Sequence, residues 1–280
     1  MIKNKLGLIL ILLTSSCSIK LIDKKYELVN KRADGLSQIR ALRDFGDVKK
    51  GTLGGFIQSE NNLSHEGTCW VYDWAQVFEG ARVSDDAQVH HHALVYEKAQ
   101  VSGRARVTNE AKVYGEARVS GEARVFNRAR VLKEAQVYGE TMVFEGAWVY
   151  GKAQVSDRAR VYGKARVFGE ARVHGEALVF NNAKVFGEAR VFDTAKVYYD
   201  ARVLGDARIF NNARVTGTAE IYGNALVYTH TRVYDNAKIY GDATVCRNYD
   251  VNGTTIINKP SEVSNNIEER QLDEEECMYD

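Results

Sequence analysis

This 280-residue sequence has little proline and cysteine, and its net charge is close to zero. Its one proline, Pro260, excludes a proline-rich linker. The four cysteines, at positions 17, 69, 246 and 277, have no metal-binding spacing and are too few for a disulfide scaffold. Lysine and arginine number 38 against 37 acidic residues, and this balance argues against a nucleic-acid partner. The glycines follow a repeat and form no phosphate-binding loop, so we expect no cofactor.

A long apolar run is absent as well. The eight-residue run 6–13 is too short for a transmembrane helix, which needs about 20 residues. Lysines precede it and small polar residues follow it, as in a secretory signal. The ending Ser15-Ser16-Cys17 resembles the lipobox of bacterial lipoproteins, although Thr14 stands where that motif usually has leucine. A start codon placed too far upstream, or a plain N-terminal anchor, would also explain the apolar run. The resemblance implies a signal peptide over 1–17, lipidation of Cys17 and a lipid anchor to a membrane of the cell envelope, outside the cytoplasm.

The middle of the chain is one uninterrupted repeat. From Val71 to Val251 every sixth residue is Val or Ile, at 31 positions without an insertion or deletion. The residue four places later, from 75 to 243, is Ala in 27 of 29 cases, the exceptions being Thr141 and Thr231. The second residue after each aliphatic position is Gly, Asn or Asp in 22 of 30 units, and these residues favour turns. The exceptions include Lys133, Tyr199, Thr229 and Arg247, where we expect strained or differently shaped corners.

A period of six fits neither a helix, whose period is 3.6, nor a single strand, whose period is two. It fits a short strand followed by a corner. Three such sides close an 18-residue triangular coil, and successive coils stack as parallel strands about 4.8 Å apart. The span 71–251 then makes about ten coils, and the stack is roughly 48 Å long. The sequence therefore predicts an all-β, triangular parallel β-helix.

This regularity resembles the hexapeptide-repeat, left-handed parallel β-helix superfamily, and the left hand of the coil is implied by that resemblance alone. The segments 39–49 and 53–57, with Cys69-Trp70-Val71, resemble the opening of YdcK-type repeat proteins. We expect a linker and N-terminal cap over 18–70, the β-helix over 71–263 and an acidic, solvated tail over 264–280. The resemblance implies an acyltransferase label and subunits that form trimers.

The outward position after each aliphatic residue is often aromatic. We expect one face to be a surface for binding or for oligomer contacts, because its ten outward positions are all aromatic or Leu. This surface would serve a homo-oligomer, either a trimer or a side-by-side pair, or would bind a glycan or protein ligand. The alternative is that stacked rings only stabilise each face. The positions on this first face are Phe78, Tyr96, Tyr114, Leu132, Tyr150, Phe168, Phe186, Leu204, Tyr222 and Tyr240.

Histidines are the candidates for chemistry, because the superfamily's acyltransferases use a histidine base. His174 and His230 are weak catalytic candidates, and both fall on the outer surface. The adjacent His90, His91 and His92 are weak metal candidates because consecutive side chains point in different directions, and we expect no metal. His65 falls on the inward phase of the cap, which favours a hydrogen-bonding role there over catalysis.

The remaining cysteines fall in different environments. Cys69 occupies the small inward column, so we expect a buried thiol. Cys246, on an outward column, and Cys277, in the tail, are candidates for a disulfide if the protein is exported.

Two functions remain open on the sequence alone. The first is a non-enzymatic, envelope-anchored structural or binding module that presents aromatic and arginine faces. The second is an acyl(acetyl)transferase of the hexapeptide-repeat superfamily. The coils carry no loop that would close over a substrate, which favours the first function, so any catalysis would have to arise between chains.

Overall fold

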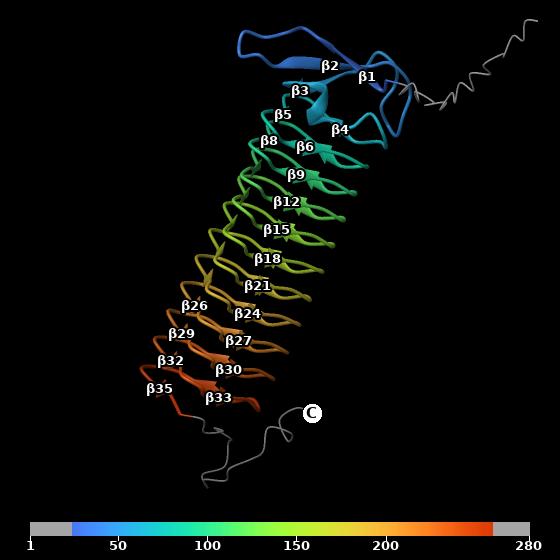
Figure 1. The fold of residues 1–280 in the computed structure, drawn as a ribbon. Coiled ribbons are helices and arrows are strands. Elements are labelled where there is room, and N and C mark those ends of the chain that lie inside the picture. The colour runs from blue at the N-terminus through green and yellow to red at the C-terminus, as the bar shows by residue number, and fades with distance from the viewer. Residues whose placement is uncertain (1–23, 260–280) are drawn as a thin grey trace, which may run out of the picture.

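The computed structural model describes residues 24–259, which form a rod of stacked triangular coils with a cap at its N-terminal end (Figure 1). Almost all regular structure is β, and the one short helix within these residues is the 3-10 helix η1 (Glu60–Asn62). The rod has three parallel sheets, one on each side of the triangle, so the all-β parallel solenoid predicted from the repeat is confirmed. The left hand stays an expectation from the resemblance.

The first face is the 14-stranded sheet. Its repeat strands are two residues long, since each side of the triangle has room for little more before the next corner. They are β5 (Gln76–Val77), β8 (Leu94–Val95), β11 (Lys112–Val113), β14 (Arg130–Val131), β17 (Trp148–Val149), β20 (Arg166–Val167), β23 (Lys184–Val185), β26 (Arg202–Val203), β29 (Glu220–Ile221), β32 (Lys238–Ile239) and β35 (Ile256–Ile257).

The second face has 11 strands and the third has 10. The second comprises β4 (Trp70–Val71), β7 (Gln88–Val89), β10 (Arg106–Val107), β13 (Arg124–Val125), β16 (Met142–Val143), β19 (Arg160–Val161), β22 (Leu178–Val179), β25 (Lys196–Val197), β28 (Arg214–Val215), β31 (Arg232–Val233) and β34 (Asp250–Val251). The third comprises β6 (Arg82–Val83), β9 (Gln100–Val101), β12 (Arg118–Val119), β15 (Gln136–Val137), β18 (Gln154–Val155), β21 (Arg172–Val173), β24 (Arg190–Val191), β27 (Arg208–Ile209), β30 (Leu226–Val227) and β33 (Thr244–Val245).

Each coil stands in register on the next. Val113 of β11 pairs with Val95 of β8 and with Val131 of β14, and the same register holds along the repeat. The aliphatic and alanine columns point inward, and nearly all of their side chains are fully buried. The core is therefore a continuous column of small branched side chains, with Ala beside each corner where a larger group would overpack.

Every corner from Asp73 to Arg247 uses a left-handed residue, with φ between 53° and 75°. Lys133, Tyr199 and Thr229 adopt this conformation although their β-carbons disfavour it. The predicted strain at these exceptional corners is confirmed. Arg247 is followed by a second left-handed residue, Asn248, so this corner also differs in shape.

Parallel pairing begins before Val71, inside the segment expected to be the cap. Strand β3 (Leu53–Ile57) pairs in parallel with β5, and Leu63 forms a parallel bridge with Val83. The antiparallel strands β1 (Tyr26–Val29) and β2 (Ser37–Ala41) then extend the first-face sheet beyond β3. The cap is thus an irregular first coil with an antiparallel hairpin added to one of its sides.

Close packing under the hairpin requires small residues. Gly54 lies so near the next coil that a β-carbon there would come within 2.5 Å of the Val71 carbonyl oxygen and 2.7 Å of the Trp70 ring. Trp70 is fully buried, and its ring meets Phe45 edge-on with 5.3 Å between centroids. The end of the hydrophobic column is therefore covered by aromatic groups of the cap.

At the other end, Ile257 keeps the six-residue phase and pairs with Ile239, so an eleventh turn begins. Val263, the tail 264–280, Cys277 and the N-terminal segment 1–23, with Cys17, lie outside the described residues.

The two threonines of the alanine column provide a matched test of core packing. The Thr141 hydroxyl donates to the Tyr138 carbonyl at 2.6 Å, whereas the equally buried Thr231 hydroxyl has no hydrogen-bond partner among the described residues. We expect Thr141→Ala to destabilise the protein by about 1 kcal/mol and Thr231→Ala to stabilise it by up to about 1 kcal/mol. Urea unfolding followed by circular dichroism measures both, and equal losses in the two variants would contradict the assignment.

Candidate functional surface

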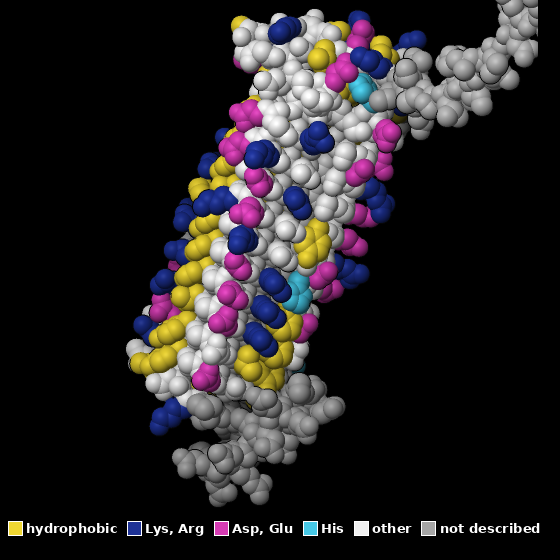
Figure 2. Space-filling model, in the orientation of Figure 1, with side chains coloured by type: hydrophobic (Ala, Val, Ile, Leu, Met, Phe, Trp, Pro, Cys, Tyr) yellow, Lys and Arg dark blue, Asp and Glu magenta, His cyan; other side chains and the backbone are white. Residues whose placement is uncertain are grey.

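The most extensive feature of the surface is the first face. Its outward aromatic side chains stack nearly parallel along the rod, with 4.7–5.2 Å between neighbouring ring centroids and no more than 5° between ring planes. Figure 2 shows them as a yellow band along one edge of the rod. We call the ten positions from Phe78 to Tyr240 the first-face ladder; Leu132 and Leu204 interrupt its rings.

The other faces carry shorter ladders. Five rings stack without a break on the second face, and four stack on the third, with 4.6–5.0 Å between neighbouring centroids. The second-face stack is Phe126, Phe144, Tyr162, Phe180 and Tyr198, and the third-face stack is His174, Phe192, Phe210 and Tyr228. The N-terminal half of the third face is mostly serine, at positions 84, 102, 120 and 156.

Stacking leaves these rings half-buried. Desolvation by their neighbours is the main cause that raises the pKa of Tyr96, Tyr150 and Tyr162. Within a stack each ring covers the faces of the next, so a ligand can reach ring edges and hydroxyl groups but not the flat ring faces. This geometry suits packing against another protein surface better than stacking of sugar rings.

Basic side chains accompany the first-face ladder, because an arginine often precedes the aliphatic residue of a strand. The guanidinium carbons of Arg130 and Arg166 lie 4.7 and 5.4 Å from the Trp148 ring centroid, one coil away on either side. Arg202 lies 5.9 Å from the Phe186 ring centroid. These arginines thus lie against aromatic rings of the first face.

The two catalytic candidates lie on the third-face side of the rod with few polar partners. His174 stacks on Phe192, and its Nδ1 is 3.9 Å from Asp157 Oδ2, which is too long for a hydrogen bond. His230 lies at a corner, and its Nε2 is 3.4 Å from the Asn212 amide nitrogen. Neither histidine sits in an enclosed pocket.

The three adjacent histidines diverge. His90 stacks on Tyr72 at 4.0 Å between centroids, and the His91 amide donates to the Asp73 carboxylate at 3.0 Å. Within residues 24–259 no group of three or more His, Cys, Asp or Glu side chains is placed to hold a metal ion.

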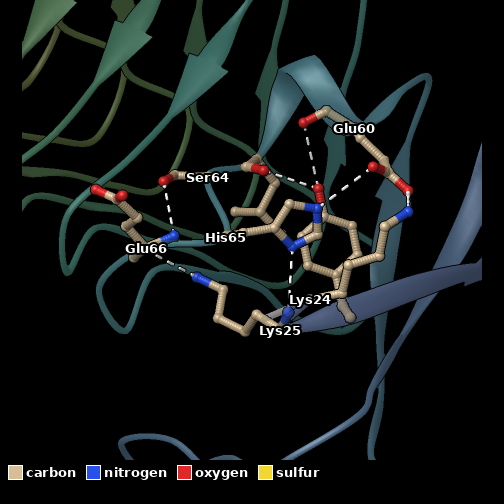
Figure 3. A network of polar contacts seen from close by, with 8 residues as sticks. Lys24, Lys25, Glu60, Ser64, His65 and Glu66 are labelled. Carbon is tan, nitrogen blue, oxygen red and sulfur yellow. Dashed lines mark hydrogen bonds and ion pairs between the residues drawn. The ribbon is translucent and has the colours of Figure 1, made fainter. Parts of the chain in front are cut away.

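The cap contains a dense polar network around a buried lysine (Figure 3). The fully buried Lys25 ammonium donates to the Cys69 carbonyl at 2.9 Å and lies 3.2 Å from the Cys69 sulfur. The Glu66 and Gly67 carbonyls lie 3.3 and 3.4 Å from the same nitrogen. Burial lowers the pKa of Lys25 and raises that of Cys69. Cys69 is a buried thiol, as predicted. We interpret the network as a set of contacts that fixes the first strand to the first coil.

His65 belongs to the same network. Its Nδ1 accepts from the Lys25 amide at 3.2 Å, its ring stacks on Tyr26, and its Nε2 lies 3.4 Å from Glu60 Oε2. The predicted hydrogen-bonding role in the cap agrees with these contacts. Sequence reasoning missed Lys25 because this residue precedes the repeat, and no periodic signal marks it as buried.

A shallow polar groove runs along the corner between the first and third faces. Its lining alternates corner residues with residues of the third-face strands: Glu116, Arg118, Glu134, Gln136, Lys152, Gln154, Glu170 and Arg172. No inserted loop covers it, because the coils between Val71 and Val251 have no insertion. Cys246 is buried beneath the end of the third-face ladder, whereas its predicted partner Cys277 is outside the described range.

Three in-register parallel sheets, left-handed corners and a six-residue period define a parallel β-solenoid of hexapeptide repeats. A family model described as YdcK Beta solenoid repeat matches residues 99–115 and 153–169. The chain is also similar to a protein of Escherichia coli (strain K12) named "Uncharacterized acetyltransferase YdcK", with 47% identity over 55 residues. Residues 99–115 and 153–169 are thus similar to the β-solenoid repeat of YdcK-type proteins. The match to the Escherichia coli protein covers 19% of this chain and only 17% of that protein's length. Across the described part of the chain, no helix is both long and apolar enough to cross a membrane.

The Tyr72–His90 stack makes stability depend on pH. Burial lowers the pKa of His90, so the unfolded chain, with a histidine pKa of about 6.5, binds a proton that the folded site rejects. The stability that this group contributes is present above the unfolded pKa and is lost as the pH falls through it. We expect His90→Phe, which keeps a ring on Tyr72, to lose less unfolding free energy than the wild type between about pH 7.5 and about pH 5.5. Urea unfolding at the two pH values tests this, with His92→Asn at the exposed corner as the control. An unchanged pH response in His90→Phe would contradict the assignment.

Proposed function

We propose that this protein is a non-enzymatic rod, anchored to the cell envelope by its N-terminus, that acts as a structural or binding module and associates with itself through its first face. The observation that carries this proposal is the first-face ladder, which runs the length of the repeat. Monomeric proteins seldom leave an apolar stripe of this length exposed to water. Its stacked rings offer their edges to a second surface.

The histidine geometry supports a non-enzymatic role. A general base acts from within hydrogen-bond reach of its partner and of the substrate, in a site from which water is excluded. His174 lacks a carboxylate within hydrogen-bond distance, and His230 is paired with an amide. The groove at the corner is shallow and polar, and no loop lies over it.

The second candidate function is acetyl transfer from an acetyl-CoA donor. It is favoured by the name of the Escherichia coli relative and by Asp157, which lies near His174. Such a site would need a second chain to complete it. Location also separates the two functions, because acyl-CoA donors are cytoplasmic metabolites and an exported protein would lack them.

Acetyl-CoA titration by calorimetry separates the two functions directly. We expect no binding to the wild-type protein, and the same result for His174→Ala and His230→Ala, with unchanged circular dichroism. Saturable binding that one histidine replacement abolishes, together with acetyl transfer to an amine acceptor, would favour the transferase. Binding that both replacements leave intact would point to a site elsewhere on the rod.

Labelling with palmitate tests the proposed anchor. We expect the full-length protein, expressed in bacteria, to incorporate the label and the Cys17→Ser variant to remain unlabelled and leave the membrane fraction. A soluble, unlabelled wild-type protein would contradict the envelope location and would make acetyl transfer the stronger candidate.

A further inference from the structure

We infer that the first face pairs with the first face of a second copy of this chain, with both rods running in the same direction and in register. This inference deepens the proposed self-association and rests on it. It comes from the charges that flank the first-face ladder.

Charged residues border the ladder in two columns of opposite sign. The basic column lies two residues before the ladder positions, within the first-face strands, and the acidic column lies two residues after them, at the corner where the first face meets the third. In Figure 2 a row of mostly magenta side chains, with some blue ones among them, runs beside the yellow band, and blue side chains lie along its other side. The basic column is Lys112, Arg130, Arg166, Lys184, Arg202 and Lys238; the acidic column is Glu116, Glu134, Glu170, Glu188, Asp206 and Asp242.

The two columns match on six of the ten rungs. Every coil that has a cation at the first position has a carboxylate four residues later, on the other side of the ladder residue. Two later coils depart from the pattern without placing like charges at the two positions. One has Trp148 and Lys152, which are an aromatic ring and a cation, and the other has Glu220 and Asn224.

In the part of the chain that the structure describes, the cation and the carboxylate of one rung do not pair with each other. The backbone between them turns at a left-handed corner residue, and their α-carbons lie at most about 13 Å apart. The ion pairs on this side of the rod run along its axis instead, as in Lys98–Glu116, Lys152–Glu170 and Arg202–Glu220. Within the described residues, the carboxylates of Glu134, Glu188 and Asp206 and the ammonium groups of Lys112 and Lys184 take part in no ion pair.

Symmetry then selects one arrangement. If two first faces meet around a two-fold axis parallel to the rods, the basic column of each copy lies opposite the acidic column of the other. If the rods run in opposite directions, basic lies opposite basic and acidic opposite acidic. Charge complementarity therefore favours the parallel pair, since like charges in an interface oppose association. In that pair each ladder residue faces its own counterpart, and Lys152 of one copy approaches Trp148 of the other.

The size of the face is sufficient for a specific contact. Ten rungs spaced about 4.8 Å apart, each five residues wide, give roughly 600 Å² per copy. The total of roughly 1,200 Å² reaches the range of specific interfaces. The apolar ladder would form its centre and the charged columns its rim, as in protein–protein interfaces generally.

The other faces lack this self-complementarity. The second face places like charges four residues apart on two rungs, as Arg124 with Arg128 and Arg160 with Lys164. The third face has the cation–carboxylate combination on three rungs, but the outward residues of these rungs are Ser84, Ser120 and His174, and none of them is apolar. Both rods of a parallel pair also have their N-termini at the same end, so two lipid anchors could enter one membrane.

Charge reversal on two rungs tests the arrangement. The protein used is the full chain carrying Cys17→Ser, and its oligomeric state is measured by sedimentation velocity over a range of concentrations. We expect the parent chain to form dimers. Lys112→Glu with Lys184→Glu, and separately Glu116→Lys with Glu188→Lys, should each raise the dimer dissociation constant about 30-fold or more, because each reversal affects four exposed ion pairs.

The chain that carries all four reversals is the decisive variant. It restores opposite charges only when the basic and acidic columns face one another, so we expect it to dimerise like the parent. Circular dichroism of all variants controls for folding. Failure of the fourfold variant to dimerise, while the parent does, would overturn the parallel arrangement and leave self-association intact. A monomeric parent would overturn self-association as well, and a trimer would overturn the two-fold pair.

Disulfide cross-linking gives an independent measure of direction. In a parallel, in-register pair, Tyr114→Cys and Tyr222→Cys should each cross-link with an identical chain, whereas Ser120→Cys, on the third face of nearly the same coil, should not. Cross-linking of Tyr222→Cys only in a mixture with Tyr96→Cys chains would show rods that run in opposite directions, because full overlap then places position 96 opposite position 222. Equal cross-linking of Ser120→Cys would show that the first face is not the contact.

Discussion

Pairing of each aliphatic residue with the one 18 positions away is the constraint on which the rest of this molecule depends. Val113 lies between Val95 and Val131, and this register leaves no freedom to the residues around it. Any property that recurs at the same period becomes a straight line on the surface. The aromatic ladders, the left-handed corners and the two charged columns of the first face are all such lines. The two-residue strands would be too short to persist alone, but each is held by a neighbour above and below.

The periodic part of the structure was predictable because a fixed period converts directly into geometry. The inward Val and Ala columns, the outward first-face ladder and the left-handed backbone at Lys133, Tyr199 and Thr229 all follow from counting in sixes. The cap was predictable only as an interruption. Nothing periodic marks Lys25, Trp70 or Gly54, and their roles depend on which segments fold back on the first coil. The inward phase of His65 predicted that it would form hydrogen bonds in the cap. It did not predict which residues would be its partners.

The candidate sites divide in the same way. The ladder was predictable as a surface, and the structure adds that its ring faces are mutually covered. The side-chain distances around His174 and His230 were not predictable, because outward polar side chains have several rotamers and a repeat does not say which neighbour each will contact. The matching of cations and carboxylates across the ladder is visible in the sequence, but it acquires meaning only when both columns are known to border the same exposed face.

The corner geometry has a consequence for how such a chain can change its length. Loss or gain of a single hexapeptide would leave the core intact, because valine would still stand on valine and alanine on alanine. Beyond the change, however, every outward column would move to the next side of the triangle, and the ladder and its charged borders would be cut in two. Only changes of 18 residues, a whole coil, preserve both the interior and the surface. A gene for this fold can therefore lengthen or shorten the rod in units of eighteen codons without altering what the rod presents, whereas smaller steps exchange one surface for another.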